Sequence, residues 1–232
     1  MKTATTPQNL TDQVYDTIVE EVCTGAIVPG EHLVQEQLAE RFGVSRQTIM
    51  QAMARLKADG LCEQIGRRGL QVSVLDLDKV QYHYDIRAAL DGLGAKGAAR
   101  QAKASRETAE TLARLGGELL KEGERARMRG DIAEQVRLDM ELHALIYDHS
   151  GNPLLAGTAE PHWRFLRRAM SEVLRHGDLP LEVWQQHREI LDAIIAGDAA
   201  SAELYMVAHD LDAATALSKA LSSPMDQGLP AD

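Results

Sequence analysis

The stretch from Gln37 to Ile65 limits the fold of this chain more than any other, because it reads as two short helices, a tight turn between them and a strand. Gly43 can adopt a positive φ without a Cβ clash, so it can end the first helix sharply. Ser45 is a favourable N-cap for the second helix. Apolar residues at helical spacing predict the buried stripe of that helix, formed by Ile49, Ala52, Met53 and Leu56. The stretch therefore predicts a helix–turn–helix.

Polar residues near the start of the second helix lie off this stripe. In a helix–turn–helix, side chains at this place read base edges in the major groove. An ordinary helical hairpin is the alternative interpretation of the stretch taken alone. If the helix binds DNA, the candidate residues at its start are Ser45, Arg46, Gln47, Thr48 and Gln51.

Two short apolar runs, 62–65 and 69–74, flank a glycine turn that contains Arg67 and Arg68. Such a hairpin is a wing, and an arginine pair at its tip suits phosphate or minor-groove contact. Gly69 completes the candidate DNA-binding residues. Helix, helix, strand, basic turn and strand in this order predict a winged helix–turn–helix, which favours DNA binding over the ordinary hairpin.

The charge of the chain argues against binding DNA by bulk attraction. The 232 residues carry 25 Lys and Arg against 35 Asp and Glu, which gives a formal net charge of −10. DNA binding by so acidic a chain must depend on where a few arginines lie.

Cysteine usage and hydropathy indicate where the protein works. Cys23 and Cys62 lie in apolar positions and are expected to be small core residues in a reducing compartment. No apolar run approaches the ~18 residues of a membrane span. We therefore expect a cytoplasmic protein with no membrane partner.

From Val80 onward the sequence predicts helices and no strand, over 80–100, 105–130, 131–147, 154–174, 180–196 and 198–221. Gly116 and Gly117 weaken the middle of the second helix, and Pro161 favours a kink in the fourth. The fold class is mainly α: an N-terminal winged helix–turn–helix with a small β-hairpin, followed by an all-α bundle of six or seven helices. The expected domains are 1–75 and 76–222, with a connector at 75–79 and a disordered tail at 223–232.

Residues 10–74 resemble the DNA-binding domain of GntR-type bacterial transcription regulators. The resemblance implies a homodimer that binds double-stranded operator DNA. Met50 departs from the family pattern, because the family usually has there an Arg that contacts DNA, so the operator sequence is expected to differ. The residues that carry the resemblance are Gly25, Pro29-Gly30, Leu33, Leu38-Ala39, Gly43-Val44-Ser45-Arg46, Leu56, Gly60-Leu61 and Arg68-Gly69.

Four residues of the helical region could meet at one metal ion. Asp139 and His143 are four residues apart and share a face of one predicted helix. His187 and His209 lie near the apolar stripes of the last two helices. Inward faces of a bundle can come together, and three imidazoles with a carboxylate can then bind one divalent metal. Taken singly, each histidine is more simply interpreted as a core or boundary residue.

Residues 80–220 resemble the FCD domain, the all-helical ligand-binding domain of the FadR-type branch of the same family. The resemblance implies that Asp139, His143, His187 and His209 bind a divalent ion; Zn, Ni or Mn suits such mixed nitrogen and oxygen ligands best. The matching pieces are YDIRAALDGLGAKGAA, the D-x3-H-x2-I from Asp139 to Ile146, Gly151-Asn152, the H-x2-I-x2-A-I-x2-G-D from His187 to Asp198, and His209.

The same resemblance implies an effector, a small carboxylate or sugar acid at the open positions of the ion. Arg87 matches a family Arg that faces the effector in some members, and it could pair bidentately with a carboxylate. Trp163 and Arg167 could line the pocket. We therefore expect a metabolite-responsive repressor of a metabolic operon. Two alternatives stay open: a metalloenzyme that uses the Asp/His3 site for hydrolysis, and an ion that only ties helices together.

Overall fold

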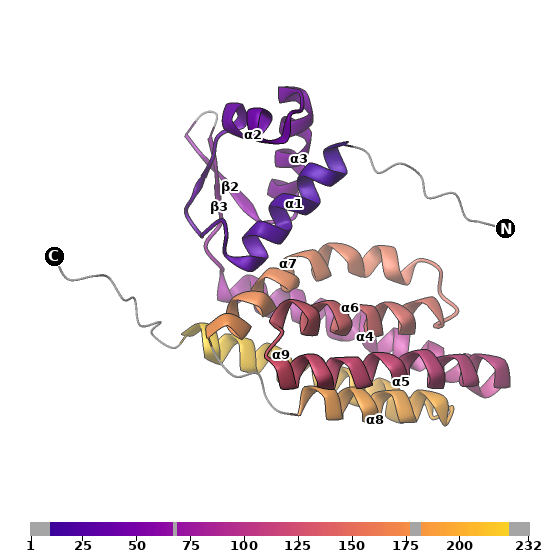
Figure 1. Cartoon of the computed structure of the whole chain (residues 1–232). Helices are drawn as coiled ribbons and strands as arrows, with labels where there is room; N and C mark the ends of the chain where they lie inside the picture. The colour runs from indigo at the N-terminus through magenta and orange to yellow at the C-terminus, as the bar shows by residue number, and fades with distance from the viewer. Residues whose placement is uncertain (1–9, 67–68, 177–181, 223–232) are drawn as a thin grey trace. The chain divides into compact units, whose positions relative to one another are not determined.

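The computed structural model describes residues 10–66, 69–176 and 182–222. The chain divides into two compact units, Met1–Leu75 and Asp76–Asp232, and each unit has its own apolar core. A small sheet and three helices form the first unit, and helices form the second (Figure 1). The predicted fold class is therefore confirmed. None of the described helices combines the length and the hydropathy that a membrane span requires.

The first unit is a winged helix–turn–helix. Its strand β3 lies between β1 and β2 and is antiparallel to both. The strand β1 was not predicted, because a strand of two residues is too short to show an alternating pattern. The elements are α1 (Leu10–Thr24), β1 (His32–Leu33), α2 (Gln35–Phe42), α3 (Arg46–Ala58), β2 (Cys62–Ile65) and β3 (Gly69–Val72).

The turn between α2 and α3 forms as the sequence predicts. Gly43 ends α2 in the left-handed region, with a φ of 63°. The Ser45 side chain accepts a hydrogen bond from the backbone N–H of Thr48 at 3.1 Å and so caps α3. The predicted stripe of α3 is buried in the core. These local signals fix the angle at which α3 leaves the turn.

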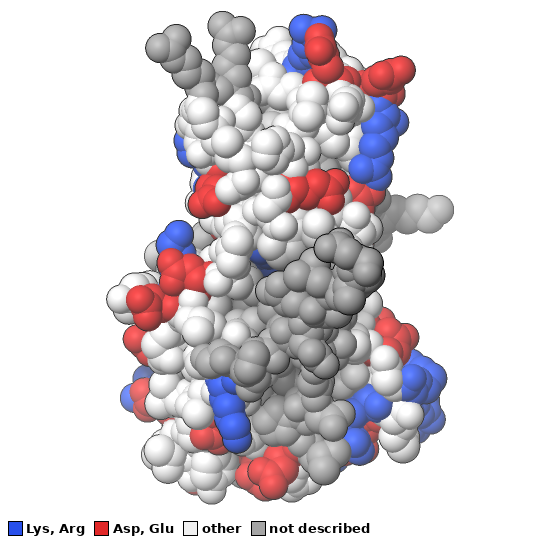
Figure 2. Space-filling view, turned by 90° about the vertical axis from the view of Figure 1, so that its left-hand side faces the viewer, with Lys and Arg blue, Asp and Glu red and all other residues white. Residues whose placement is uncertain are grey.

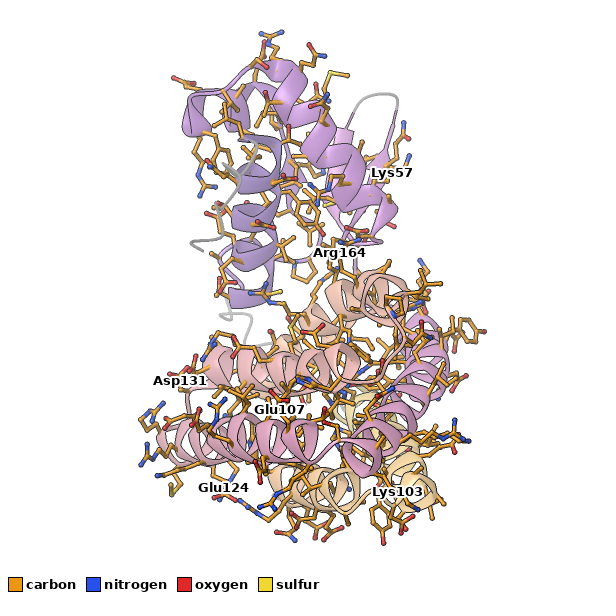
Figure 3. The ribbon with its side chains drawn as sticks, turned by 90° about the vertical axis from the view of Figure 1, so that its right-hand side faces the viewer. Lys57, Lys103, Glu107, Glu124, Asp131 and Arg164 are labelled. Carbon is orange, nitrogen blue, oxygen red and sulfur yellow. The ribbon has the colours of Figure 1, made fainter. Side chains whose placement is uncertain are left out.

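The second unit is a bundle of helices. In it, α4 packs along α9, and α5 lies between α6 and α8 (Figure 1). Ser105 caps α5, and Asp131, labelled in Figure 3, caps α6. The elements are α4 (Leu77–Ala104), α5 (Arg106–Arg129), α6 (Ile132–Asp148), α7 (Leu155–His176), α8 (Val183–Ile195) and α9 (Ala199–Ser222).

Three details differ from the sequence prediction. The first bundle helix begins at Leu77 rather than Val80, because the Asp76 side chain accepts from the N–H groups of Asp78 and Lys79, so the predicted connector is shorter. The helix α5 runs unbroken through Gly116 and Gly117. The third difference is at the wing, whose second strand ends at Val72 rather than at residue 74. The predicted tail, 223–232, lies outside the described residues.

Packing explains one glycine of this adjacent pair in α5. A Cβ added to Gly116 would lie 2.7 Å from Cδ2 of Leu191 on α8, whereas one added to Gly117 would meet no atom within 4 Å. Gly116 thus permits the close approach of α8, and burial of that contact outweighs the propensity cost of the glycine.

Candidate metal centre and DNA-binding surface

The outer face of α3 presents the polar residues predicted to read DNA. Arg46 and Gln47 are exposed, and Thr48 is half-buried. Arg46 forms an ion pair with Glu36 of α2, in which both side chains are about two-thirds exposed, 67% and 68%. An exposed pair of this kind is weak and exchanges easily for another partner. Arg46 is therefore accessible to a ligand of this face.

Gln51 is also exposed, and its Oε1 accepts a hydrogen bond from Thr11 Oγ1 of α1 at 3.1 Å. Lys57, labelled in Figure 3, donates to Gln64 Oε1 at 2.8 Å. Gly69 begins β3. The wing residues Arg67 and Arg68 lie outside the described residues.

Charge is dispersed on the face of the molecule shown in Figure 2, where Lys and Arg side chains alternate with Asp and Glu among the coloured atoms. This agrees with the net charge of −10. Any DNA affinity must then arise from individual contacts more than from a broad positive field.

The four predicted metal ligands come together in the second unit. Asp139 and His143 on α6, His187 on α8 and His209 on α9 are all buried, and one ligand atom from each lies within 4.8 Å of those from the others. Asp139 Oδ1 is 3.2 Å from His187 Nε2, and His187 Nε2 is 3.1 Å from His209 Nε2. Helices distant in sequence thus converge on one point.

The geometry of this cluster fits a divalent ion. Atoms bound at about 2.1 Å in adjacent octahedral positions lie roughly 3.0 Å apart, close to the two shortest separations. Within the described residues, Asp139 Oδ2 and His187 Nδ1 are buried without a hydrogen-bond partner. Buried polar atoms normally have a partner, and an ion between the ligands would supply one for Asp139 Oδ2; it would not do so for His187 Nδ1, because His187 faces the other ligands with Nε2.

The protonation states also suit metal binding. Burial lowers the pKa of His187 and lowers the pKa of His209 well below its ordinary value. Burial alone would raise the pKa of Asp139, but the hydrogen bond from His187 and the nearby positive groups hold it below its ordinary range. Two imidazoles are therefore neutral and the carboxylate is ionised at neutral pH, which are the ligating forms.

Two of the histidines are oriented by a second hydrogen bond. His143 Nδ1 lies 3.0 Å from Asp91 Oδ2, and His209 Nδ1 lies 3.0 Å from Gln186 Oε1. Gln186 in turn donates from Nε2 to Asp212. Such outer partners fix the ring orientation and place the free Nε2 atom toward the ion. The sequence interpretation missed Gln186, because nothing in a lone glutamine indicates its partner.

Arg87 is the centre of a buried ionic network. Its Nε donates to Asp91 Oδ2 at 2.9 Å, and its Nη2 lies 3.2 Å from Asp210 Oδ1. The guanidinium carbon is 3.5 Å from the ring centroid of Trp163, which gives a cation–π contact. Arg87 Nη2 is also 3.2 Å from His143 Nε2, so binding of an ion by that nitrogen has to displace this contact.

The aromatic residues of this network extend it to α7. Tyr147 donates its hydroxyl hydrogen to Asp91, and Trp163 Nε1 donates to Tyr147 Oη at 3.0 Å. Burial alone would raise the pKa of Asp91, but the Arg87 charge and the hydrogen bonds from His143 and Tyr147 hold it below its ordinary range. The spacing of Arg87 and Asp91, four apart on a helix, is the signal that could have predicted their pairing.

A cavity of about 40 Å³ lies beside this cluster. Its lining includes Asp139 and His209 from the candidate metal site, Arg87, and the buried Tyr84. The Tyr84 hydroxyl has no hydrogen-bond partner within the described residues. Trp163 and Arg167, predicted to line an effector pocket, are not among the described residues of this lining; Trp163 is buried in the Arg87 network and Arg167 is half-buried on α7.

Comparison with known proteins identifies both units. Residues 10–72 match the family described as bacterial regulatory proteins, gntR family, and residues 83–213 match the FCD domain. The chain is 30% identical over 199 residues, 85% of this chain and 86% of the relative, to the uncharacterised HTH-type transcriptional regulator YdhC of Bacillus subtilis. It is 27% identical over 227 residues, 88% of this chain and 84% of the relative, to the putative L-lactate dehydrogenase operon regulatory protein of Escherichia coli.

Solved structures show the same fold. The structure titled E. coli McbR/YncC superposes with a TM-score of 0.74 over 91% of this chain and 98% of that chain, at 21% identity. The relatives are regulators of transcription, so the hydrolase alternative is dropped. The chain thus belongs to the gntR family of bacterial regulatory proteins, as a DNA-binding transcription regulator whose second unit is an FCD domain.

Proposed function

We propose that this regulator is a homodimeric repressor whose FCD domain binds one divalent ion, and that a small organic acid bound at the ion releases the operator. The observation that carries the proposal is the convergence of Asp139, His143, His187 and His209 beside a cavity. Zn, Ni or Mn suits three imidazoles and one carboxylate. An ion with a purely structural role would need no cavity at its side, so the cavity favours a ligand-binding role.

The charges around the ion favour an anionic effector. Arg87 is positive, and Asp91 and Asp139 are negative. Burial raises the pKa of Asp210 well above its ordinary value, which favours the neutral form of this carboxyl group. A divalent ion would then leave one uncompensated positive charge in a buried site, which is costly. A single carboxylate would neutralise it.

The polar groups around the cavity suit an organic acid. Within the described residues, the polar contacts of Arg87 use Nε and Nη2, which leaves Nη1 for an effector carboxylate. The Tyr84 hydroxyl lacks a partner and could meet a hydroxyl or carbonyl of the same ligand. One relative is named for an operon of L-lactate dehydrogenase, an enzyme whose substrate is a small hydroxy acid.

The size of the cavity supports a switch. A volume of about 40 Å³ holds a few water molecules and is far below that of a typical ligand pocket. An effector must therefore bind a more open arrangement of the helices. This difference in affinity between two arrangements is what allows a ligand to shift an equilibrium. If the open arrangement changes the spacing of the two winged units of a dimer, the operator is released, which is the behaviour of a repressor.

An apolar stripe supports the homodimer. On α9, Leu204, Ala208 and Leu211 are exposed and lie on one face, and on the neighbouring helix α4 Ile86 and Leu93 are also exposed. Contiguous exposed apolar residues are typical of protein interfaces. A two-fold dimer would present two copies of α3 to two half-sites of an operator.

Metal content and DNA binding together test the proposal. The full chain is purified, its metal is measured by elemental analysis, and an operator is selected from a random-sequence duplex library. We expect one divalent ion per chain, its loss in His187→Ala and in His209→Ala, and a fall in operator affinity when a small carboxylate or sugar acid is added only while metal is present. If chelation changes neither the operator affinity nor the response to acids, the ion is structural and the switch lies elsewhere.

Two further measurements test the DNA contacts and the dimer. Arg46→Ala should lose roughly 1–3 kcal/mol of binding free energy if Arg46 contacts a guanine. Removing Arg67 and Arg68 together should weaken binding to all DNA sequences alike and reduce its salt dependence.

Light scattering should give a dimer mass for the wild type and a monomer mass for Leu204→Glu. A monomer with full operator affinity would refute the dimer.

A further inference from the structure

The exposed face of α3 contains an apolar residue between its polar ones. Met50 is 55% exposed, and it is separated by one helical turn from Arg46 before it and from Ala54 after it. All three side chains are exposed, whereas the opposite stripe of α3 is buried. A single exposed methionine on a surface is common, but this one lies in the middle of the face proposed to meet base edges.

The chemistry of the major groove limits what Met50 can contact there. The edges of guanine, cytosine and adenine offer hydrogen-bond donors and acceptors, and thymine alone adds an apolar group, its C5 methyl. A thioether donates no hydrogen bond and accepts one only weakly. Against a G·C pair, Met50 would displace water from polar atoms without replacing their hydrogen bonds. Against a T·A pair it would bury the methyl group.

We propose that Met50 selects thymine in each operator half-site, through contact with the C5 methyl group. The proposal rests on the proposed role of α3 as the reading helix. Four residues of an α-helix rise about 6 Å, which corresponds to roughly two base pairs at 3.4 Å each. The selected thymine therefore lies within about two base pairs of the base that Arg46 contacts.

The neighbours of Met50 are consistent with this assignment. Ala54 continues the apolar line one turn further and could reach a second thymine methyl. The flexible side chain of methionine can adjust to the position of a methyl group without strain. Within the described residues, Met50 is not among those packed against the core of the winged unit, so its replacement leaves that core intact.

Replacement of thymine by uracil removes only the methyl group and so tests the contact directly. Half-sites are first selected from a random duplex library with the wild-type chain. Each thymine of the selected half-site is then replaced in turn by deoxyuridine, and affinity is measured by fluorescence anisotropy at fixed salt. At one thymine, we expect wild-type affinity to fall about fourfold, the effect of losing one buried methyl group. Met50→Ala should bind the thymine and uracil duplexes equally.

A control uses the same substitution elsewhere. Met128, on α5, is 71% exposed, and Met128→Ala should keep the full sensitivity to uracil. The proposal is overturned if no uracil replacement weakens the wild type, or if Met50→Ala is weakened as much as the wild type. Arg46→Ala separates this failure from that of the proposed function: if Arg46→Ala binds the selected half-site as well as the wild type does, the assignment of α3 fails, and the role of Met50 fails with it.

Discussion

An arginine–carboxylate pair occurs in each unit, and the two pairs differ in exposure. In the FCD domain, the Arg87 and Asp91 side chains are 2% and 0% exposed, whereas in the winged unit Arg46 and Glu36 are 67% and 68% exposed. A buried charge cannot lose its partner without a large desolvation cost, but an exposed one is solvated by water and screened by salt. The buried arginine therefore holds the surroundings of the candidate metal ligands in place, and the exposed arginine remains free to exchange Glu36 for another partner.

The largest effect is expected from a substitution that breaks the buried pair. Arg87→Met leaves the Asp91 carboxylate buried without its cation, and should lower the free energy of unfolding of the FCD domain by about 3–5 kcal/mol. Arg46→Met is the same chemical change in an exposed pair and should cost less than about 1 kcal/mol. Urea unfolding of the full chain, followed by circular dichroism, measures both.

The outcome bears directly on the comparison. Equal losses of unfolding free energy in the two variants would mean that burial does not determine how much each ion pair contributes to stability. A small loss in Arg87→Met would indicate that water or a shifted carboxyl proton compensates for the missing guanidinium.

The next largest effect is a pH dependence that arises at the buried site. The pKa values of His187 and His209 are lowered in the folded chain, so the unfolded chain, with His pKa values near 6.5, takes up protons first as the pH falls. Stability contributed by these neutral histidines is therefore present above pH ~6.5 and is lost progressively below it. Bound metal should steepen this loss, because the ligands must be neutral.

Thermal unfolding between pH 8 and pH 5, with metal added and with chelator, measures this dependence. We expect the increase in Tm on adding metal to shrink steadily below pH ~6.5 and to be absent from the variant with both His187→Gln and His209→Gln. The exposed residue His32 is the control, since His32→Gln should leave the curve unchanged. An increase in Tm that is constant across this pH range would contradict histidine ligation.

A smaller effect is expected from replacing a residue that orients one of the candidate metal ligands. Gln186 accepts from His209 Nδ1 and is itself held by Asp212. Gln186→Leu should weaken metal binding by about 10- to 100-fold, the usual effect of losing such an orienting partner. Its neighbour Gln185 contacts Glu189 on the surface of α8 instead, so Gln185→Leu should leave metal affinity unchanged. Competition against a chromophoric chelator measures the metal affinity of both variants. Equal affinities in the two variants would contradict an orienting role for Gln186.

These residues also mark where sequence reasoning was sufficient and where it was not. The helix–turn–helix was predictable because Gly43 and Ser45 act within a few residues of themselves, through a positive φ and an N-cap. The four metal candidates were proposed from helical spacing and supported by the resemblance, and the structure brings them together. Gln186 and Asp210 were not predicted, because their partners come from other helices and leave no periodic signal.

The paired glycines of α5 show the same limit. Their sequence predicts a weak point, and propensity alone cannot tell a glycine that packing requires from one that it does not. The structure separates them, because a Cβ at Gly116 would meet Leu191, while one at Gly117 would meet nothing within 4 Å.

The smallest effect we expect comes from filling that open space. Gly117→Ala adds a methyl group that meets no atom and reduces the freedom of the unfolded chain, so it should stabilise the FCD domain by roughly 0.5–1 kcal/mol. Gly123, further along α5, is the buried counterpart: its Cβ would lie 2.2 Å from the ring of Trp184. Gly123→Ala should therefore destabilise the domain by about 1–3 kcal/mol through overpacking. Urea unfolding measures both variants. The decisive result is a gain of unfolding free energy in Gly117→Ala and a loss in Gly123→Ala. If Gly117→Ala is also destabilising, the space beside it is filled in solution, and a second copy of the chain packed against α5 would be the first explanation to examine by light scattering.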